Sequence, residues 1–386
     1  MQLFFRKFVS RTLIIINYTA AILFIISCFT PYLDPGRWWF TGFMGLLFPY
    51  LLLINFFFLV FWLFLRPRRS LISFICILIG LPAVNTLIAF NISTTFDLQK
   101  ETAAIRVMNW NVRRFTPFNT TIFNPKHTDN KQAIFEEIRK FNPDVLCLQE
   151  FFSLDQSGNL NNIELLKQEL GFTHHIFSKD NLIQGKLFSG TVIFSRFPIF
   201  NDSVIRYPTG ASKAAENITS ADIAVNDDTI RIYNMHLQSF GFGPKDYSNF
   251  DKIQNQQDTG LHASKNILKK MRQTFYLHSL QADFVKKQLS NSPYPVIACG
   301  DLNDVPNSYA YYTISDDMND CFLEEGVGIG KTFISPTSRL LGSLPTLRID
   351  YIFTAPEMET LQFTRMRRKL SDHSALVADI EVSAKE

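Results

Sequence analysis

Residues 296–304 read VIACGDLND, and this stretch decides how the rest of the chain is interpreted. Its first four residues are apolar, as in a strand that is buried on both faces. Gly300 then leads directly to Asp301 and Asn303, whose side chains are of the type that binds metal ions or phosphate. A protein can hold such groups rigidly where a strand ends. The stretch therefore predicts a buried strand that delivers functional residues to the edge of a sheet.

The same arrangement recurs at five other places along the chain. Each place has an acid, amide or imidazole side chain at or near the end of an apolar, strand-like segment. These side chains are Asn111 in WNV, Glu150 in CLQE, His236 in YNMHLQS, Asp350 in LRIDYIF, and Asp372 with His373 in LSDHSAL. Taken singly, such residues are as often turn residues, and a lone histidine is more often a hydrogen-bonded core residue. Six occurrences need a common cause, so we expect these side chains to meet at one rim.

Residues 105–386 are expected to form one α/β domain. Short β-rich segments bounded by turn residues predict strands at 105–112, 144–149, 190–194, 221–225, 229–235, 296–299, 348–353 and 375–380. Apolar residues at helical spacing predict helices at 131–141 and 265–289, and the polar residues 238–260 are interpreted as a long loop. Many strands, few helices and no internal repeat favour an α/β sandwich.

Three long segments without Asp, Glu, Lys, Arg or His precede this domain, at residues 12–33, 38–65 and 71–96. Each is long enough for a helix that crosses a membrane, which needs about 20 apolar residues. A cleaved signal peptide would explain the first segment only, and buried helices of soluble domains seldom contain such long apolar runs. We therefore expect residues 1–96 to be a membrane anchor with three transmembrane helices, near 12–33, 42–65 and 71–91, and residues 97–104 to be a linker.

The cations that flank these segments predict their orientation, because Lys and Arg in short loops stay on the cytoplasmic side. Three cations precede the first segment and three separate the second from the third; they are Arg6, Lys7, Arg11, Arg66, Arg68 and Arg69. The loop between the first two segments holds only Asp34 and Arg37. With the N-terminus in the cytoplasm, three crossings place the following domain outside it, in the periplasm or the extracellular space.

The motifs WNV, CLQE, GDLND, RIDYIF and SDH occur in the order seen in the endonuclease/exonuclease/phosphatase superfamily. The resemblance spans about residues 105–380. This superfamily includes deoxyribonuclease I, apurinic endonucleases and neutral sphingomyelinases. The resemblance implies a deoxyribonuclease I-like fold of two packed β-sheets flanked by helices. It also implies a divalent-metal-dependent phosphoester hydrolase, with phosphodiesters as the favoured substrates.

The resemblance further implies a metal site and a histidine–aspartate pair. Glu150 resembles the metal-binding glutamate of the family, and Asp372 is expected near the same ion. Carboxylate oxygens suit hard cations, so Mg²⁺ or Mn²⁺ is the expected cofactor. His373 resembles the histidine that contacts the phosphate or helps to activate water, and Asp350 resembles the aspartate that holds this histidine.

The remaining motif residues are expected to act on the water, the leaving group and the phosphate. His236 resembles a second histidine of the deoxyribonuclease and sphingomyelinase branches, which could protonate the leaving oxygen. Asp301 would orient or deprotonate the attacking water. Asn303 and Asn111 would bind phosphoryl oxygens or support the metal. Because the apurinic endonuclease branch lacks a histidine at the position of His236, DNA repair is disfavoured.

The substrate is left open between nucleic acid and phospholipid headgroups. The net charge of +3 gives no general basic field. Substrate choice is expected to depend on residues 240–260 and on the cationic strip 365–369, the lipid bilayer is the expected partner of the anchor, and no obligate protein partner is evident. An alternative is a catalytically inactive membrane protein that uses the fold to bind a phosphorylated ligand or a partner. A channel is a weaker interpretation, because the apolar segments contain no ionisable acid, base or histidine.

One further motif suggests a nucleotide site only at first sight. Residues 326–332 read GVGIGKT, but a P-loop requires glycine at position 325, where the chain has glutamate. We interpret the segment as a loop. Within the family resemblance, Lys331, Thr332 and Phe333 lie between GDLND and RIDYIF and are expected to border the site.

Overall fold

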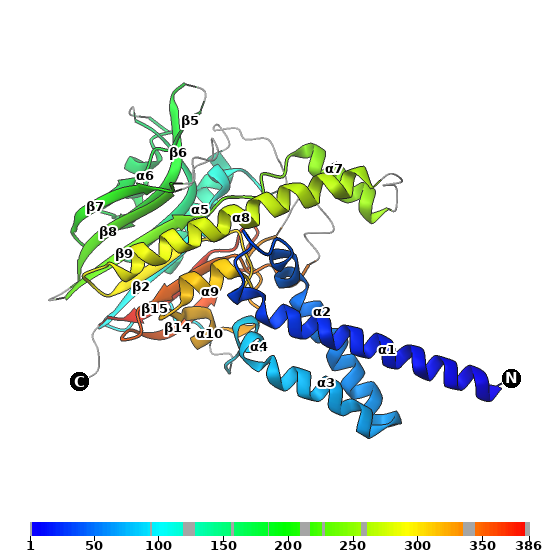
Figure 1. Ribbon diagram of the computed structural model, residues 1–386. Coiled ribbons are helices and arrows are strands. Elements are labelled where there is room, and N and C mark those ends of the chain that lie inside the picture. Colours follow the sequence, from blue (N-terminus) through cyan, green and yellow to red (C-terminus); the bar gives the residue numbers. More distant parts are fainter. Residues whose placement is uncertain are drawn as a thin grey trace.

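In the computed structural model, two β-sheets pack face to face and helices cover their outer sides (Figure 1). The structure describes residues 2–92, 95–118, 128–155, 158–183, 185–208, 217–225, 228–255, 261–334 and 344–382. The strands of the first sheet are β2 (Ala104–Asn111), β3 (Val145–Leu154), β4 (His174–Phe177), β5 (Asn181–Ile183), β6 (Leu187–Ser195), β14 (Glu359–Arg365) and β15 (Leu376–Glu381). Their order is β14-β15-β2-β3-β6-β4, with β5 paired to β6.

The second sheet has six strands in the order β11-β13-β10-β9-β8-β7. They are β7 (Ile199–Arg206), β8 (Asn217–Val225), β9 (Asp228–His236), β10 (Val296–Asp301), β11 (Asn319–Asp320) and β13 (Asp350–Thr354). Helices α5 (Thr128–Phe141) and α6 (Asn162–Leu170) pack on the first sheet. Helices α8 (His262–Ser290) and α9 (Tyr309–Ser315) pack on the second. The expected two-sheet sandwich flanked by helices is confirmed.

The sequence of β2 explains why this strand is buried on both faces. Ile105 and Val107 point into the core between the two sheets. Met108 and Trp110 alternate with them and enter the second core, beneath α5 and α6. Successive side chains of a strand point to opposite faces, so one apolar strand can serve two cores. The central strands thus position the sheet rigidly between two hydrophobic layers.

Two expectations about local structure are wrong. The strand that was expected to end at Gln149 continues to Leu154, and the pairing register with β6 shifts between Leu148 and Phe151. Glu150 lies in this irregular segment with a φ of 49°, because a bulge lets one residue leave the regular ladder. Residues 238–260 are not all loop, since they include helix α7 (Pro244–Gln254). The proline at the first helical position, where no hydrogen bond is lost, is a typical helix start.

The N-terminal part of the chain is helical. Helices α1 (Gln2–Phe29) and α2 (Thr41–Leu65) are long and apolar enough to cross a membrane. Helices α3 (Pro67–Ile79) and α4 (Leu81–Leu87) qualify only as a pair, and they meet at a bend of 63°. Pro82 lies at this break and cannot donate the backbone hydrogen bond that would continue α3. The structure therefore has two such helices, or three if the bent pair is one span, and the continuous third helix expected at 71–91 is not formed.

Helices α1–α4, here called the helical module, are joined to the sandwich through several specific contacts. Strand β1 (Ala89–Phe90), just after α4, pairs with β12 (Val327–Gly328). The Asn307 side chain donates a hydrogen bond to the carbonyl of Ser27 at 2.9 Å. Gly42 on α2 lies against the ring of Phe275 on α8, where a Cβ atom would overlap that ring at 2.3 Å. These contacts fix the module against the second sheet and its helices.

Arg106 and Asp379 form a buried ion pair between neighbouring strands of the first sheet. The Arg106 guanidinium donates to the Asp379 carboxylate at 2.6 and 2.7 Å, and both side chains are buried. We expect Asp379→Ala to lower the free energy of unfolding by about 3–5 kcal/mol, because it leaves a buried charge without its partner. Chemical denaturation of the full chain in detergent would measure the change.

The exposed pair Arg139–Glu169 provides the matched control. Glu169→Ala removes the same type of ion pair in contact with water, so its effect should stay below about 1 kcal/mol. Equal effects of the two substitutions would contradict the role assigned to the buried pair.

Candidate functional site

Three buried amide side chains connect the two sheets directly beneath the rim where the predicted site residues lie. Gln149 on β3 donates to the side-chain oxygens of Asn109 on β2 and Asn234 on β9, both at 2.7 Å. Asn109 donates to two backbone carbonyls of the second sheet at 3.1 and 3.2 Å, and Asn234 donates to two of the first sheet at 2.9 and 3.0 Å. This amide network fixes the relative position of the sheets at the level of the site.

The strand ends above the amide network bring the predicted residues together. Strands β2 and β3 run parallel, as do β9 and β10, so their last residues reach the same rim. Asp301 is paired in register with His236 on one side and with Asp350 on the other. Asn111 spans the gap between the sheets and donates to Asp301 at 3.0 Å. The expected meeting of residues distant in the sequence is therefore present in the structure.

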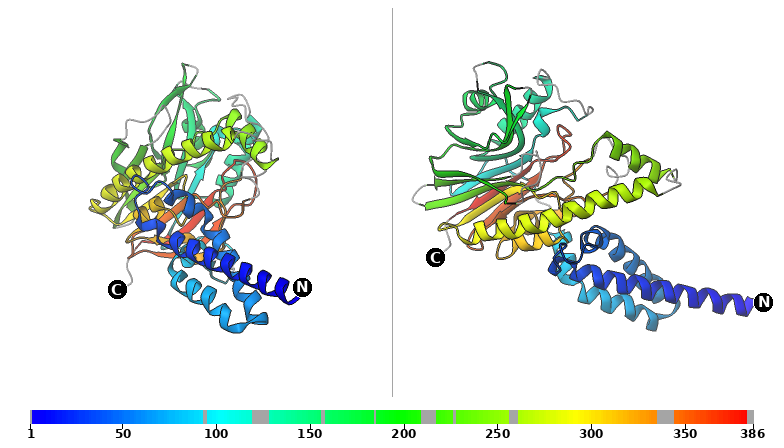
Figure 2. Two further views of the ribbon diagram at one scale, coloured as in Figure 1. Left: turned by 45° about the vertical axis from the view of Figure 1, so that its right-hand side comes forward. Right: turned by 45° about the horizontal axis from the view of Figure 1, so that its top comes forward.

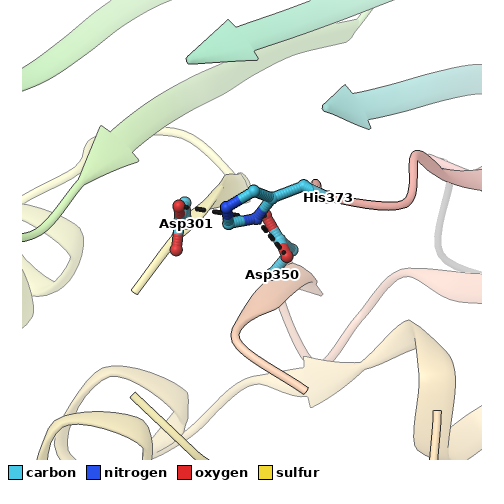
Figure 3. A group of neighbouring side chains, drawn as sticks. All are labelled: Asp301, Asp350 and His373. Carbon is cyan, nitrogen blue, oxygen red and sulfur yellow. Dashed lines mark hydrogen bonds and ion pairs between the residues drawn. The ribbon is translucent and has the colours of Figure 1, made fainter. Parts of the chain in front are cut away.

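His373 lies between two carboxylates (Figure 3). Its Nδ1 atom is 2.9 and 3.0 Å from the two oxygens of Asp350 and 3.6 Å from Asp301. Burial lowers the pKa of His373, but the carboxylates of Asp350, Asp301 and Asp372 outweigh this effect and raise it well above its usual value. The surrounding carboxylates therefore favour the protonated imidazole. Its Nε2 atom, 4.0 Å from Asp372, is turned away from Asp350.

The segment around Thr332 supports this pair. The hydroxyl oxygen of Thr332 accepts hydrogen bonds from the backbone N–H groups of Ile349 and Asp350 at 2.9 and 3.2 Å. The ring of Phe333 packs edge-on against His373 at 5.2 Å. Thr332 and Phe333, two of the three residues expected to border the site, therefore do so, and Thr332 holds the start of the strand that carries Asp350.

His236 is the second histidine at the rim. Its Nε2 atom lies 3.8 Å from Asp301, and neither ring nitrogen has a hydrogen-bond partner among the residues that the structure describes. A nearby buried carboxylate, Asp180, was not found from the sequence. Burial raises the pKa of Asp180, whereas the hydrogen bond from Ser178 and the nearby Arg206 and His236 oppose the shift; Asn217 also donates to this carboxylate. A buried histidine with open nitrogens is available to a ligand or to water.

Glu150 and Asp372, the expected metal ligands, lie on the other side of Asn111. Glu150 is 31% exposed and is 3.5 Å from the amide nitrogen of Asn111. Asp372 is largely buried, and this burial together with the charge of Glu150 raises its pKa. Arg113 approaches Asp372 at 3.2 Å and Arg114 approaches Glu150 at 3.8 Å. The two carboxylates therefore lie near each other, each beside an arginine.

The two arginines were missed in the sequence, although they directly follow the WNV motif. Arg113, Arg114 and the next residue, Phe115, have φ values of 48°, 51° and 54°. Three consecutive left-handed residues with side chains are costly, at about 1–3 kcal/mol each, and such strain gathers at functional sites. The Nη1 atom of Arg113 is buried without a hydrogen-bond partner among the described residues. This atom is a donor that a phosphate could use.

Asn303 has a local role in addition to any role toward the phosphate. Its backbone N–H donates to Asp301 at 2.9 Å, and its side chain donates to the carbonyl of Leu237 at 3.0 Å. These bonds tie the loop after β10 to the loop after β9. In the cationic strip, Arg368 pairs with Glu137 at 3.0 Å and Arg365 contacts Ser374 at 3.4 Å, so both have partners within the chain.

The donor atoms at the rim fit a divalent cation. Asp301, Asp350 and His373 each place a ligand atom within 4.8 Å of the others, and all three are buried. Glu150 and Asp372 add two further carboxylates beside them. Oxygen-rich sites of this kind suit Mg²⁺ or Mn²⁺ better than softer metals. However, Asp350 is already engaged by His373, whereas Glu150 is more exposed and its contacts with Asn111 and Arg114, at 3.5 and 3.8 Å, are long.

Comparisons with known proteins agree with this geometry. Residues 108–373 match the endonuclease/exonuclease/phosphatase family, and residues 10–87 match a domain of unknown function. No curated protein matches the sequence. An endonuclease/exonuclease/phosphatase from Beutenbergia cavernae is 20% identical, with 72% of each chain covered and a TM-score of 0.50. Humanized TDP2 of D. rerio is 15% identical, with 72% of this chain and 99% of that chain covered and a TM-score of 0.50.

The two-sheet sandwich, with acids and imidazoles converging at one rim, is the architecture of a phosphoester-hydrolysing class of protein. The family match covers most of the chain and includes every predicted site residue from Asn111 to His373. The chain belongs to the endonuclease/exonuclease/phosphatase family. The resemblance found in the five motifs is thereby confirmed, while the likeness to the solved structures shows the fold alone.

The pKa of His373 provides a direct test of the carboxylate cluster. Asp350→Asn removes the charge nearest to the imidazole, so the pKa of His373 should fall and the imidazolium should become less populated at neutral pH. Histidine-selective NMR of the full chain in detergent would follow the titration. The exposed His262 serves as an internal reference that should not change, and an unaltered pKa of His373 would contradict the arrangement.

The amide network can be tested with a nearly isosteric change. Asn234→Leu removes the side-chain hydrogen bonds to the carbonyls of Leu148 and Val192 and one of the two bonds donated by the Gln149 amide, and each unsatisfied buried group costs about 1–3 kcal/mol. We expect a loss of at least about 2 kcal/mol in unfolding free energy, measured by denaturant titration in detergent. Asn291→Leu, at an exposed position just after α8, is the control and should leave stability nearly unchanged.

Proposed function

We propose that this chain is a membrane-anchored, divalent-metal-dependent phosphodiester hydrolase that acts on nucleic acid or phospholipid headgroups. The observation that carries the proposal is the position of His373 between Asp350 and Asp301 at the rim. An imidazolium held by one carboxylate beside a second one suits a reaction that needs both a positive charge and a proton acceptor. Membership of the family supports phosphoester hydrolysis as the reaction.

Asp301 is the residue placed to orient the attacking water. One of its oxygens accepts from the backbone of Asn303 and the other from the Asn111 side chain. This second oxygen also faces His236 at 3.8 Å and His373 at 3.6 Å, distances that leave both imidazoles without a direct bond to it. A water between these groups would be held for in-line attack on phosphorus.

His373, with Arg113 close by, stabilises the negative charge that builds on the phosphoryl oxygens. His373 keeps its proton on Nδ1 through Asp350 and presents Nε2 as a donor. The unpartnered Nη1 atom of Arg113 is a second donor. Such preorganised donors stabilise the transition state more than the ground state. His236 then supplies a proton to the leaving oxygen from the opposite side of Asp301.

The divalent cation is assigned to Glu150 and Asp372, with Asn111 as a supporting group. The support for this assignment is the exposure of Glu150, the proximity of the two carboxylates and the two arginines that balance their charge. When bound, such an ion polarises a phosphoryl oxygen and neutralises the leaving group. Asp350 remains the partner of His373.

The anchor is assigned to α1, α2 and the bent pair of α3 and α4. Their apolar length supports membrane insertion. The distribution of flanking cations supports a cytoplasmic N-terminus and three crossings, with the catalytic domain outside the cytoplasm. This arrangement places the proposed hydrolase on the outer surface of the membrane.

A metal-dependent assay tests the proposed reaction. We expect the full chain in detergent to hydrolyse bis(p-nitrophenyl) phosphate with Mg²⁺ or Mn²⁺ and to lose activity in EDTA. His373→Gln should lower kcat by about 10²-fold or more, as the loss of an acid–base group does. Glu150→Gln should raise the metal concentration needed for half-activation. Asp350→Asn should lower kcat but leave that metal concentration unchanged.

Matched substitutions away from the rim control for general damage. His174→Gln and Glu169→Gln change the same residue types elsewhere in the domain and should leave the kinetics unaltered. Absence of turnover with either metal, in a chain that is folded, would favour a catalytically inactive protein that binds a phosphorylated ligand. A panel of DNA, RNA, sphingomyelin and inositol phosphates then identifies the substrate class.

A further inference from the structure

The first half of helix α8 carries an exposed face that the proposed reaction does not use. Lys265, Lys269 and Arg272 lie on this face, with Leu261 and Leu268 beside them. At about 100° per residue, Lys265, Leu268, Lys269 and Arg272 fall within one side of the helix, and Leu261 directly precedes its first residue. Leu268 is 49% exposed. Cations beside exposed leucines on one face are typical of a helix segment that contacts a membrane interface.

The charge on this part of α8 is of one sign. Residues 261–282 contain four Lys and Arg residues and no Asp or Glu. Within the part of the chain that the structure describes, Lys270 forms an ion pair with Asp246, whereas Lys265, Lys269 and Arg272 have no ion pair with an acid. Among the described residues no acid neutralises these three cations, so an anionic partner would be attracted to them.

The same face of α8 continues directly into the contact with the anchor. Arg272 lies over the ring of Trp39 at 5.6 Å, and Tyr276 packs beside Gly36, both in the loop between α1 and α2. Trp38 and Trp39 are exposed at this loop, as expected of aromatic residues at a membrane–water interface. The cationic face thus begins where the anchor would leave the bilayer.

The views of the molecule agree on the direction of this helix. In Figure 1 and in both views of Figure 2, α7 and the first half of α8 extend away from the sandwich on the side from which α1–α3 project. The exposed face of α8 at Arg272 is turned toward the anchor. In these views the first half of α8 runs beside α1 at an acute angle, so a bilayer that surrounds α1–α3 would reach this part of α8.

We propose that the face formed by Leu261, Lys265, Leu268, Lys269 and Arg272 rests on anionic lipid headgroups of the membrane that the anchor crosses. The inference rests on the proposed anchor and gives the catalytic domain a second membrane contact. Cations attract anionic headgroups, and exposed leucines enter the boundary of the acyl chains. These leucines and the contact with the anchor loop favour a lipid surface over nucleic acid as the partner.

This contact would also orient the site toward the bilayer. His278, further along α8, is 2.6 Å from the carbonyl of Gln238, which lies two residues after His236. Gln281 on α8 accepts a hydrogen bond from the backbone of Gln238 at 2.9 Å. The helix that touches the membrane therefore also holds the loop that follows β9.

A lipid-contact experiment tests the proposal with the full chain in nanodiscs. Leu268→Cys carries an environment-sensitive fluorophore, and spin-labelled lipid serves as the quencher. Leu182→Cys on β5 is the matched control, because Leu182 is an equally apolar residue, 58% exposed, at the end of the domain remote from the anchor. Label bound by the native cysteines is measured on the unmodified chain and subtracted. Discs contain phosphatidylcholine with or without phosphatidylglycerol.

We expect quenching at position 268 to be several-fold stronger than at 182, and stronger with phosphatidylglycerol than without it. The triple variant Lys265→Gln, Lys269→Gln, Arg272→Gln should lose the dependence on phosphatidylglycerol while keeping hydrolysis of a soluble diester. Equal quenching at 268 and 182, or equal quenching in the two lipids, overturns the proposal. If the fluorescence of the probe at position 268 changes when a DNA oligonucleotide is added but does not depend on phosphatidylglycerol, the proposal is overturned in favour of nucleic acid as the partner.

The same experiment distinguishes a failure of the proposed anchor from a failure of the proposed lipid contact of α8. If the chain does not co-elute with the discs, the anchor is refuted, and this inference falls with it. If the chain co-elutes and position 268 is not quenched, the lipid face of α8 alone is refuted. Activity on the soluble diester is measured in the same samples, so neither result depends on the proposed chemistry.

Discussion

The site depends on three amides that hold the two sheets together where the strands end. Asn109, Gln149 and Asn234 are buried and hydrogen-bond one another and the backbone of the facing sheet. Apolar packing alone would let two sheets slide, because dispersion has little directional preference. Directional bonds between amides define one register. Asn111, Glu150 and His236 follow these amides by one or two positions, and Asn109 also bonds the carbonyls of Gly300 and Tyr351, next to Asp301 and Asp350. The register of the sheets therefore sets the positions of the rim residues.

The sequence was most informative where a strand is short, apolar and ends in a polar residue. That pattern predicted the rim positions of Asp301, His236 and Asp350, because alternation and strand ends are local properties. The bulge at Glu150 and the left-handed turn at Arg113 could not be predicted, since both depend on pairing with distant strands. Asp180 was missed for the same reason: only the fold brings its carboxylate close to His236.

The helices also show which features could be predicted from the sequence and which could not. Uninterrupted apolar composition correctly predicted helices α1 and α2. It overestimated the third, because the composition of residues 71–91 does not weigh the single proline at position 82 that ends α3. In α7 the error was the opposite one: a polar stretch was interpreted as loop although it forms a helix beside α8. The composition of a segment indicates its polarity more reliably than it indicates the conformation of its backbone.

Arg348 links the N-terminal helices to the sandwich through its side chain. Its buried guanidinium donates to Asp320 and to the carbonyl of Thr86 in α4, and it stacks on Phe322. Two residues later comes Asp350. A fragment cut before β2 would deprive this cation of an acceptor inside the protein and disturb the strand that carries the aspartate. The N-terminal helices therefore do more than precede the sandwich, because α4 supplies part of the buried surroundings of Arg348.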